Sequence, residues 1–297
     1  MQKGKLSLKN LYGIIYMTLA MAGFALEDLI IKMLSAFMPV SQILIYIGLF
    51  AGLVFYIIAK FNKTAVFDRN ILRDNMLRLR TLADMLGAVF IITAISMVPL
   101  STVSSILQAT PLLVTLGAAI LLKESVGWRR WSAVFIGFVG VILILKPGLS
   151  GFQAASILAL IGVIFLALRD LVTRKVKSEI PSLTVSIYAF GAAALGGFIA
   201  IPFNNPFVVL SGQQWLMILA AGFVGCFAYL TLVLATRTGD ISAIAPFRYT
   251  RLIFALILSI SVLNERPDAP TLLGATIIII SGSYIFWREN HLQKRSN

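Results

Sequence analysis

Ten apolar segments of membrane-spanning length follow one another through this 297-residue sequence. A run of about 20 apolar residues crosses the hydrocarbon core of a bilayer as a helix. Charged residues make up 12% of the chain, whereas a soluble domain carries about 25%. The sequence therefore predicts an all-α integral membrane protein with ten transmembrane helices. The predicted spans are Leu11–Leu34, Val40–Ala59, Leu79–Met97, Ser101–Leu122, Trp131–Leu145, Phe152–Arg174, Ser182–Ile201, Gln213–Ala235, Ile241–Leu263 and Pro270–Trp287.

The first span resembles a signal peptide at its beginning. Three lysines precede an apolar run that holds Ala20-Met21-Ala22, a pattern typical of a cleavage site. The apolar run continues past this point to Met33. We therefore expect a first helix that is retained in the mature protein.

The positive charges predict an orientation. With the N-terminus in the cytoplasm, nineteen lysines and arginines fall in segments on the cytoplasmic side, against Lys146 and Arg266 on the other. We expect a multi-pass protein of the bacterial inner membrane with both termini in the cytoplasm. This asymmetry also accounts for most of the net charge of +13, so the basic composition does not indicate a nucleic-acid partner.

Two pairs of segments resemble each other at nearly the same offset. Phe24–Lys32 in the first span aligns with Leu166–Arg174 in the sixth, 142 residues later, and both contain Asp-Leu-aliphatic-x-basic. Leu121–Glu124 at the end of the fourth span aligns with Val262–Glu265 at the end of the ninth, 141 residues later. The matched charges predict an internal duplication.

The duplication predicts two halves, residues 1–147 and 148–297, with five spans each. Because five is odd, the second half would enter the membrane upside down. Inverted repeats of this kind are typical of alternating-access carriers, which bind their substrate at the interface between the repeats. The five-plus-five pattern therefore favours a carrier.

The chain also resembles the drug/metabolite transporter superfamily, EamA type. The resemblance rests on the ten spans, on Leu-x-Glu at the ends of the fourth and ninth, and on the stretch Pro99-Leu-Ser-Thr, Ala109-Thr-Pro111, Glu124-x-x-Gly127-Trp128-x-x-Trp131 and Gly137-Phe-Val-Gly140. It covers nearly the whole chain. It implies a transporter, since members export amino acids and other metabolites or import compounds such as riboflavin or S-adenosylmethionine.

Eight ionisable residues lie inside the predicted spans. Each costs about 2.5–3.5 kcal/mol on insertion scales, so each needs a partner or a function. Four are acidic and four are basic, which indicates pairing. Asp28 with Lys32 and Asp170 with Arg174 are separated by four residues on one helix face. We interpret these pairs either as gates at opposite membrane faces or as snorkelling pairs at helix ends. The eight are Glu27, Asp28, Lys32, Asp84, Arg169, Asp170, Arg248 and Arg251.

The arginines of the ninth span are candidate substrate-binding residues. Arg248 and Arg251 follow Pro246, which weakens the helix locally, and Tyr249 lies between them. Arginine binds carboxylate or phosphate through two hydrogen bonds at once. The alternative is a fixed network in which Asp84 and Asp170 neutralise both arginines. Arg169 belongs to the same group, and Gln108 lies beside Pro111 in the repeat-related fourth span.

Further carboxylates are candidates for gating or for proton coupling. Glu124 and Glu265 end repeat-related helices at opposite faces, as gates or as interfacial anchors. A coupling proton could be carried by Glu27, Asp28 or Asp84, because desolvation favours the neutral form of a carboxyl group. The sequence does not distinguish among these three.

No catalytic residue, metal site or cofactor is predicted. The chain has one cysteine, Cys226, within an apolar run, and one histidine, His291, in the polar tail. No phosphate-binding loop of the Walker type is present. We expect a secondary carrier for a small polar or anionic metabolite, with uptake of a vitamin such as riboflavin as the first hypothesis. Export of an amino acid or related metabolite is the alternative, and a non-transporting membrane scaffold is the alternative from another class. A homodimer is left open.

Overall fold

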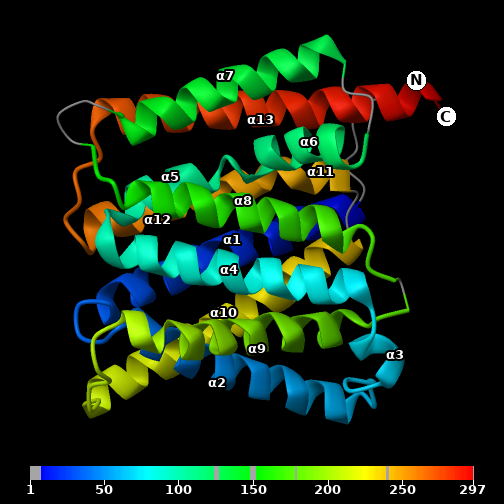
Figure 1. Cartoon of the computed structure of the whole chain (residues 1–297). Helices are drawn as coiled ribbons and strands as arrows, with labels where there is room; N and C mark the ends of the chain where they lie inside the picture. The colour runs from blue at the N-terminus through cyan, green and yellow to red at the C-terminus, as the bar shows by residue number, and fades with distance from the viewer. Residues whose placement is uncertain (1–7, 124–126, 148–151, 178, 239–240, 297) are drawn as a thin grey trace.

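The protein is described from a computed structural model, which covers residues 8–123, 127–147, 152–177, 179–238 and 241–296. Over these residues the chain forms a bundle of helices that run back and forth along one axis (Figure 1). The helices are α1 (Leu8–Leu34), α2 (Val40–Phe61), α3 (Arg69–Leu72), α4 (Asn75–Met97), α5 (Leu100–Leu107), α6 (Thr110–Leu121), α7 (Trp128–Leu145), α8 (Ser156–Thr173), α9 (Ser182–Ala200), η1 (Ile201–Phe203), α10 (Gly212–Thr238), α11 (Ile241–Ile244), η2 (Ala245–Tyr249), α12 (Thr250–Ser261) and α13 (Ala269–Ser296).

Nine segments of the described residues are helical, long and apolar enough to cross a membrane. They correspond to nine of the ten predicted spans, with α5 and α6 counted together as one. The predicted span Ile241–Leu263 is divided into α11, η2 and α12, so no single continuous helix covers it. Because Pro246 has no amide hydrogen, it cannot continue the α-helical bonding, and a 3₁₀ segment replaces it there.

The helices pack in pairs that join the two halves of the sequence. α1 packs along α10 and α4 packs along α8, while α2 pairs with α9, α7 with α13 and α5 with α12. Figure 1 shows α7 and α13 together at one edge of the bundle, with α2 and α9 at the other. α1 begins and α13 ends at the same end of the bundle, which we name the terminal end; the other is the opposite end.

Glycines allow these pairs to approach closely. A Cβ atom on Gly140 of α7 would lie 2.6 Å from the carbonyl oxygen of Gly274 in α13, and one on Gly274 would meet the Gly140 oxygen at 2.5 Å. On Gly48 of α2 it would lie 2.7 Å from the Phe190 oxygen of α9. Small residues at such crossings let two backbones come into contact, as is usual between membrane helices. Gly191 of α9 has no atom within 4 Å of such a Cβ, so a side chain would fit at this position.

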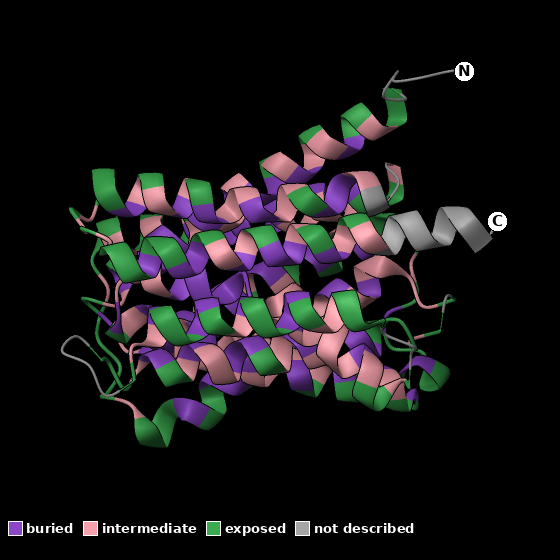
Figure 2. Ribbon diagram, turned by 90° about the horizontal axis from the view of Figure 1, so that it is seen from above, coloured by how far each residue is buried: buried purple, intermediate pink, exposed green. Residues whose placement is uncertain are grey.

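The outside of the bundle is apolar. Figure 2 shows that exposed residues lie on the outward faces of the helices, while buried residues face the interior. A soluble protein rarely exposes so large an apolar surface, whereas lipid covers it at no cost. The described chain is therefore a multi-pass membrane protein. Large hydrophobic residues that are more than half exposed include Leu49, Leu53, Ile120, Phe135, Ile199, Leu216, Phe223 and Ile280.

Candidate functional site

A network of five charged residues lies towards the terminal end, where α4 begins and α8 ends. The Asp84 carboxylate accepts a hydrogen bond from Arg80 at 3.0 Å and another from Arg169 at 3.1 Å. Arg169 also donates to Asp170 at 2.8 Å. Arg248 of η2 lies 3.9 Å from Asp170, and its side chain is 40% exposed. These residues form the five-residue network.

Four residues of this network were candidates from the sequence. Asp84, Arg169, Asp170 and Arg248 come from α4, α8 and η2, in the third, sixth and ninth predicted spans, and they lie together in the structure. Three guanidinium groups face two carboxylates, so the network carries one surplus positive charge. Arg248 is the most exposed member and makes the longest contact, which leaves its donors available to another acceptor. Arg80, which the sequence placed only at the inner edge, is buried within the network.

A second group joins α1 to α12. Arg251 donates to the Asp28 carboxylate at 2.7 and 3.2 Å, and its guanidinium lies over the Phe24 ring, 5.3 Å from the ring centre. The Glu27 carboxylate is within electrostatic range of both Asp28 and Arg251. We name Glu27, Asp28 and Arg251 the α1–α12 triad.

The alternative in which Asp84 and Asp170 neutralise Arg251 is wrong. Arg251 pairs with Asp28, which the sequence placed nearer the other membrane face. A 3₁₀-helix rises about 2.0 Å per residue, against 1.5 Å for an α-helix. The five residues of η2 therefore carry Arg251 further along the bundle than an unbroken helix would.

Two gate candidates meet at the opposite end. The Glu265 carboxylate accepts hydrogen bonds from the backbone amides of Leu100 and Ser101, at 2.6 and 3.0 Å, and from the Ser101 hydroxyl at 2.7 Å. It thereby caps the N-terminus of α5, where unpaired amides and the helix dipole favour a negative charge. The Lys32 ammonium donates to the carbonyl oxygen of Val98, which caps the C-terminus of α4, at 2.9 Å, and not to Asp28.

The remaining predicted site residues belong neither to the five-residue network nor to the α1–α12 triad. Gln108 is buried at the end of α5, where its amide donates to the Ser104 carbonyl oxygen at 3.3 Å. The Tyr249 side chain lies against Gly282 of α13, and its buried hydroxyl has no hydrogen-bond partner among the described residues. Arg174 caps the C-terminus of α8 and is exposed. Glu124 lies outside the described residues.

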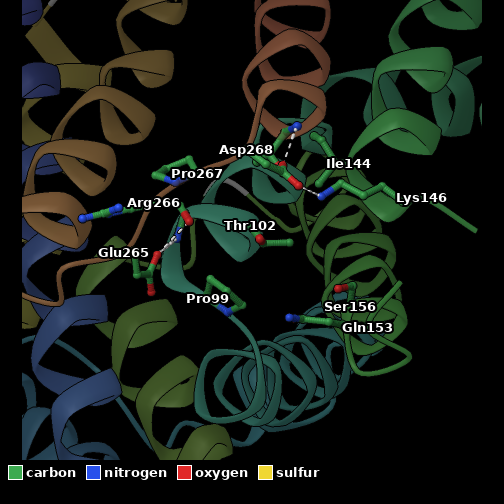
Figure 3. Close-up of a pocket in the computed structure, with 12 residues that line it drawn as sticks. Pro99, Thr102, Ile144, Lys146, Gln153, Ser156, Glu265, Arg266, Pro267 and Asp268 are labelled. Carbon is green, nitrogen blue, oxygen red and sulfur yellow. Dashed lines mark hydrogen bonds and ion pairs between the residues drawn. The ribbon is translucent and has the colours of Figure 1, made fainter. Parts of the chain in front are cut away.

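A cavity of about 260 Å³ opens at the opposite end, beside the start of α5 (Figure 3). Lys146 and Asp268 line it, point towards each other and form an ion pair. Burial raises the pKa of the Asp268 carboxyl, but hydrogen bonds from Lys146 and Thr271 lower it more, so the net pKa falls below its usual value. The sequence did not predict this pair, because Lys146 and Asp268 are 122 residues apart and each ends or precedes a span.

Within the described ranges, no three His, Cys, Asp or Glu side chains are grouped so that they could hold a metal ion. The polar groups of the network, the triad and the gate candidates are guanidinium, carboxylate, hydroxyl, amide and ammonium groups. Such groups bind and orient a charged or polar molecule.

The sequence matches the family model of the EamA-like transporter family over residues 11–146 and again over residues 153–287. The chain belongs to the EamA-like transporter family. Its fold is also that of a protein of known crystal structure, with a TM-score of 0.62 at 19% identity, over 95% of this chain and 96% of that one.

Several curated proteins resemble this EamA-like chain. It is 26% identical to the S-adenosylmethionine uptake transporter of Rickettsia prowazekii, over 66% of either chain. It is 28% identical to the riboflavin transporter of Vibrio cholerae, over 67% of this chain and 66% of that protein. The pseudopaline exporter of Pseudomonas aeruginosa is 24% identical over 91% of this chain and 94% of its own length. The first two matches thus span just under two thirds of those relatives.

Proposed function

We propose that this protein is a secondary carrier that moves a small metabolite across the bacterial inner membrane by alternating access. The observation that carries the proposal is a pair of interrupted spans that pack against each other, one from either half of the chain. α5 and α6 are separated at Gln108 and Ala109, and α11, η2 and α12 replace a continuous helix. α5 packs against α12. Interrupted helices at a repeat interface are where secondary carriers bind their substrates.

The packing pattern supports an inverted repeat of residues 1–147 and 148–297. If the two halves are related by an offset of about 141, then α1 corresponds to α8 and α4 corresponds to α10. The contact between α1 and α10 then becomes the contact between α8 and α4, and both occur. The two segments that match the family model fall one in either half. Ten spans, with both termini in the cytoplasm, follow if α11, η2 and α12 together count as the ninth.

The surplus positive charge of the five-residue network indicates the substrate class. Arg248 is partly exposed and makes only a 3.9 Å contact with Asp170. A carboxylate or phosphate could take two short hydrogen bonds from this guanidinium and neutralise the network. We therefore infer a substrate with an anionic group. An amino-acid metabolite such as S-adenosylmethionine has such a group, whereas riboflavin does not.

The two ends of the bundle would act as gates. Glu265 holds the start of α5 and Lys32 holds the end of α4, and we propose that these contacts close the opposite end. The residue before Glu265, Asn264, is in the left-handed region at φ 54°, and Lys123, which precedes Glu124, has the same φ. This shared backbone geometry supports the gating role that the sequence suggests for Glu124 at the cytoplasmic face, together with Arg174.

Thermal stabilisation of the detergent-purified protein tests the substrate class. A ligand that binds only the folded state raises the melting temperature with its occupancy. We expect S-adenosylmethionine or another amino-acid metabolite to stabilise the wild-type protein and the Arg69→Gln control, but not Arg248→Gln. Arg69 is exposed in the short helix α3, away from the five-residue network.

Other outcomes of this panel would contradict parts of the proposal. Stabilisation by riboflavin alone would overturn the inferred anionic group. Stabilisation that Arg248→Gln retains would remove Arg248 from the binding site. A folded protein that no metabolite of the panel stabilises, and that instead co-purifies with a membrane partner, would favour the scaffold over the carrier.

A further inference from the structure

Among the residues that the structure describes, the Glu27 carboxylate forms no hydrogen bond or ion pair. It lies against Gly225 of α10, where a Cβ atom on the glycine would come within 2.8 Å of the carboxyl carbon. By contrast, the other three acidic residues inside the spans each bond a guanidinium group. Those three are Asp28, Asp84 and Asp170.

The repeat shows what is missing at this position. At the offsets of 141 and 142 residues, Glu27 corresponds to Arg169 and Gly225 corresponds to Asp84. In the helix pair α4–α8, Arg169 of α8 bonds Asp84 of α4 at 3.1 Å. In the helix pair α1–α10, the residue that faces Glu27 is Gly225, which has no side chain. The charge of Arg169 is therefore neutralised by a residue of the partner helix, whereas the charge of Glu27 is not.

The guanidinium group nearest to Glu27, that of Arg251, already has bonding partners. Arg251 bonds Asp28 through two of its nitrogens and also covers the Phe24 ring. With both carboxyl groups ionised, the α1–α12 triad would carry one net negative charge inside the membrane. An ionised side chain there costs about 2.5–3.5 kcal/mol on insertion scales, and one bound proton would remove that charge.

The surroundings favour a proton over a larger cation. The carboxylate rests on the backbone of Gly225, so there is no space between them for a metal ion or an ammonium group. The other groups that face Glu27 are Asp28 on its own helix, Arg251 on α12 and the Cys226 thiol on α10. Lys32, further along α1, is bonded to the Val98 carbonyl oxygen.

We propose that Glu27 is the residue that accepts the coupling proton of this carrier, and this inference rests on the proposed function. The proton binds a Glu27 carboxylate oxygen while the site is open to one side and leaves it when the site is open to the other; no other bond is formed or broken. Arg251 and Arg248 are three residues apart on adjoining α12 and η2. Neutralising the triad would therefore act one turn away from the inferred substrate site.

Labelling with dicyclohexylcarbodiimide tests the proton site without a substrate. This apolar reagent reacts with a protonated carboxyl group, whose oxygen bonds the central carbon while its proton moves to a nitrogen. Mass spectrometry of the purified protein should find the adduct on Glu27 and not on the ion-paired Asp28 or Asp84. Labelling should fall by about tenfold per pH unit once the carboxyl group deprotonates. Equal labelling of Asp28, or labelling of Glu27 that does not depend on pH, would overturn the inference.

Transport in liposomes tests the coupling, with radiolabelled S-adenosylmethionine as the probe. We expect Glu27→Gln to exchange the probe across the membrane at equilibrium but to lose its accumulation under an imposed pH gradient. Asp68→Asn, which changes an exposed carboxylate at the start of α3, serves as the matched control and should keep both. A Glu27→Gln protein that still accumulates the probe would contradict the inference.

The two experiments separate this inference from the proposed function. If the wild-type protein neither exchanges nor accumulates the probe, the proposed substrate class fails, and the coupling role fails with it. In that case pH-dependent labelling would still identify Glu27 as a proton-binding residue. If exchange occurs and Glu27 takes up no label, the carrier stands and the proton site is wrong.

Discussion

Replacing Glu265 with alanine should open the opposite end of the bundle. The Glu265 carboxylate accepts three hydrogen bonds from two residues at the start of α5. A hydrogen bond to a charged group contributes about 1.5–3 kcal/mol, and loss of a helix N-cap costs about 0.5–2 kcal/mol. Water can replace part of the lost hydrogen bonding at a membrane surface. We therefore expect the closed state to lose about 2–3 kcal/mol of stability relative to the open one.

This free energy predicts a large change in population. At 1.36 kcal/mol per factor of ten, the open fraction should rise about 30- to 160-fold in Glu265→Ala. Glu265→Gln keeps an acceptor oxygen but loses the charge, so a rise of about tenfold is expected. Both variants act on the equilibrium between states and should still insert and fold.

A buried cysteine reports the opening. Ser104 lies within α5, one turn beyond the capped residues, and is fully buried. In a Cys226→Ala background, Ser104→Cys should react with a membrane-impermeant maleimide at a rate proportional to the open fraction. Asp268→Asn, which breaks the Lys146–Asp268 pair at the same end, is the control and should leave the rate unchanged. A labelling rate that Glu265→Ala does not raise would refute the gate.

Two further predictions concern stability. Gly274→Ala should lower the melting temperature, because its Cβ atom would lie 2.5 Å from the Gly140 carbonyl oxygen and force α7 and α13 apart. Gly191→Ala is the control and should not lower it, because no atom lies within 4 Å of the added Cβ. Equal effects of the two changes would contradict the close crossing of α7 and α13. The lowered pKa of Asp268 means that its ion pair with Lys146 contributes above the unfolded pKa of about 4 and is lost as pH falls through the folded value. The difference in melting temperature between wild type and Asp268→Asn should therefore be present at neutral pH and vanish in acid; a difference that grows in acid would contradict the pairing.

Much of the fold could be predicted from hydropathy and charge. Each of the ten predicted spans is helical over most of its length, because a backbone in lipid must satisfy its hydrogen bonds within the segment. Pro246 also predicted the interruption at η2, and the interruption between α5 and α6 lies directly before Pro111 in the first turn of α6. The predicted span Pro270–Trp287 agrees with the apolar segment Ala269–Arg288. The helix α13 itself continues to Ser296, because polar residues also form helix and hydropathy does not mark where it stops.

The charge partners were harder to predict. Spacing of four residues suggested that Lys32 pairs with Asp28, but Lys32 contacts Val98 and Asp28 contacts Arg251. Such pairs depend on which helices are neighbours and on their relative depth, and η2 changes that depth. The isolation of Glu27 could be found only by comparing the two repeats at Gly225 and Asp84, once the structure had shown that these positions face Glu27 and Arg169.

Equilibrium exchange in liposomes tests most directly whether Arg248 binds the anionic group of a transported metabolite. Vesicles that contain the purified protein are loaded with unlabelled S-adenosylmethionine, and entry of the radiolabelled compound is followed without a pH gradient. We predict exchange by the wild-type and Arg69→Gln proteins and its loss in Arg248→Gln. Exchange that Arg248→Gln leaves unchanged would contradict the central claim.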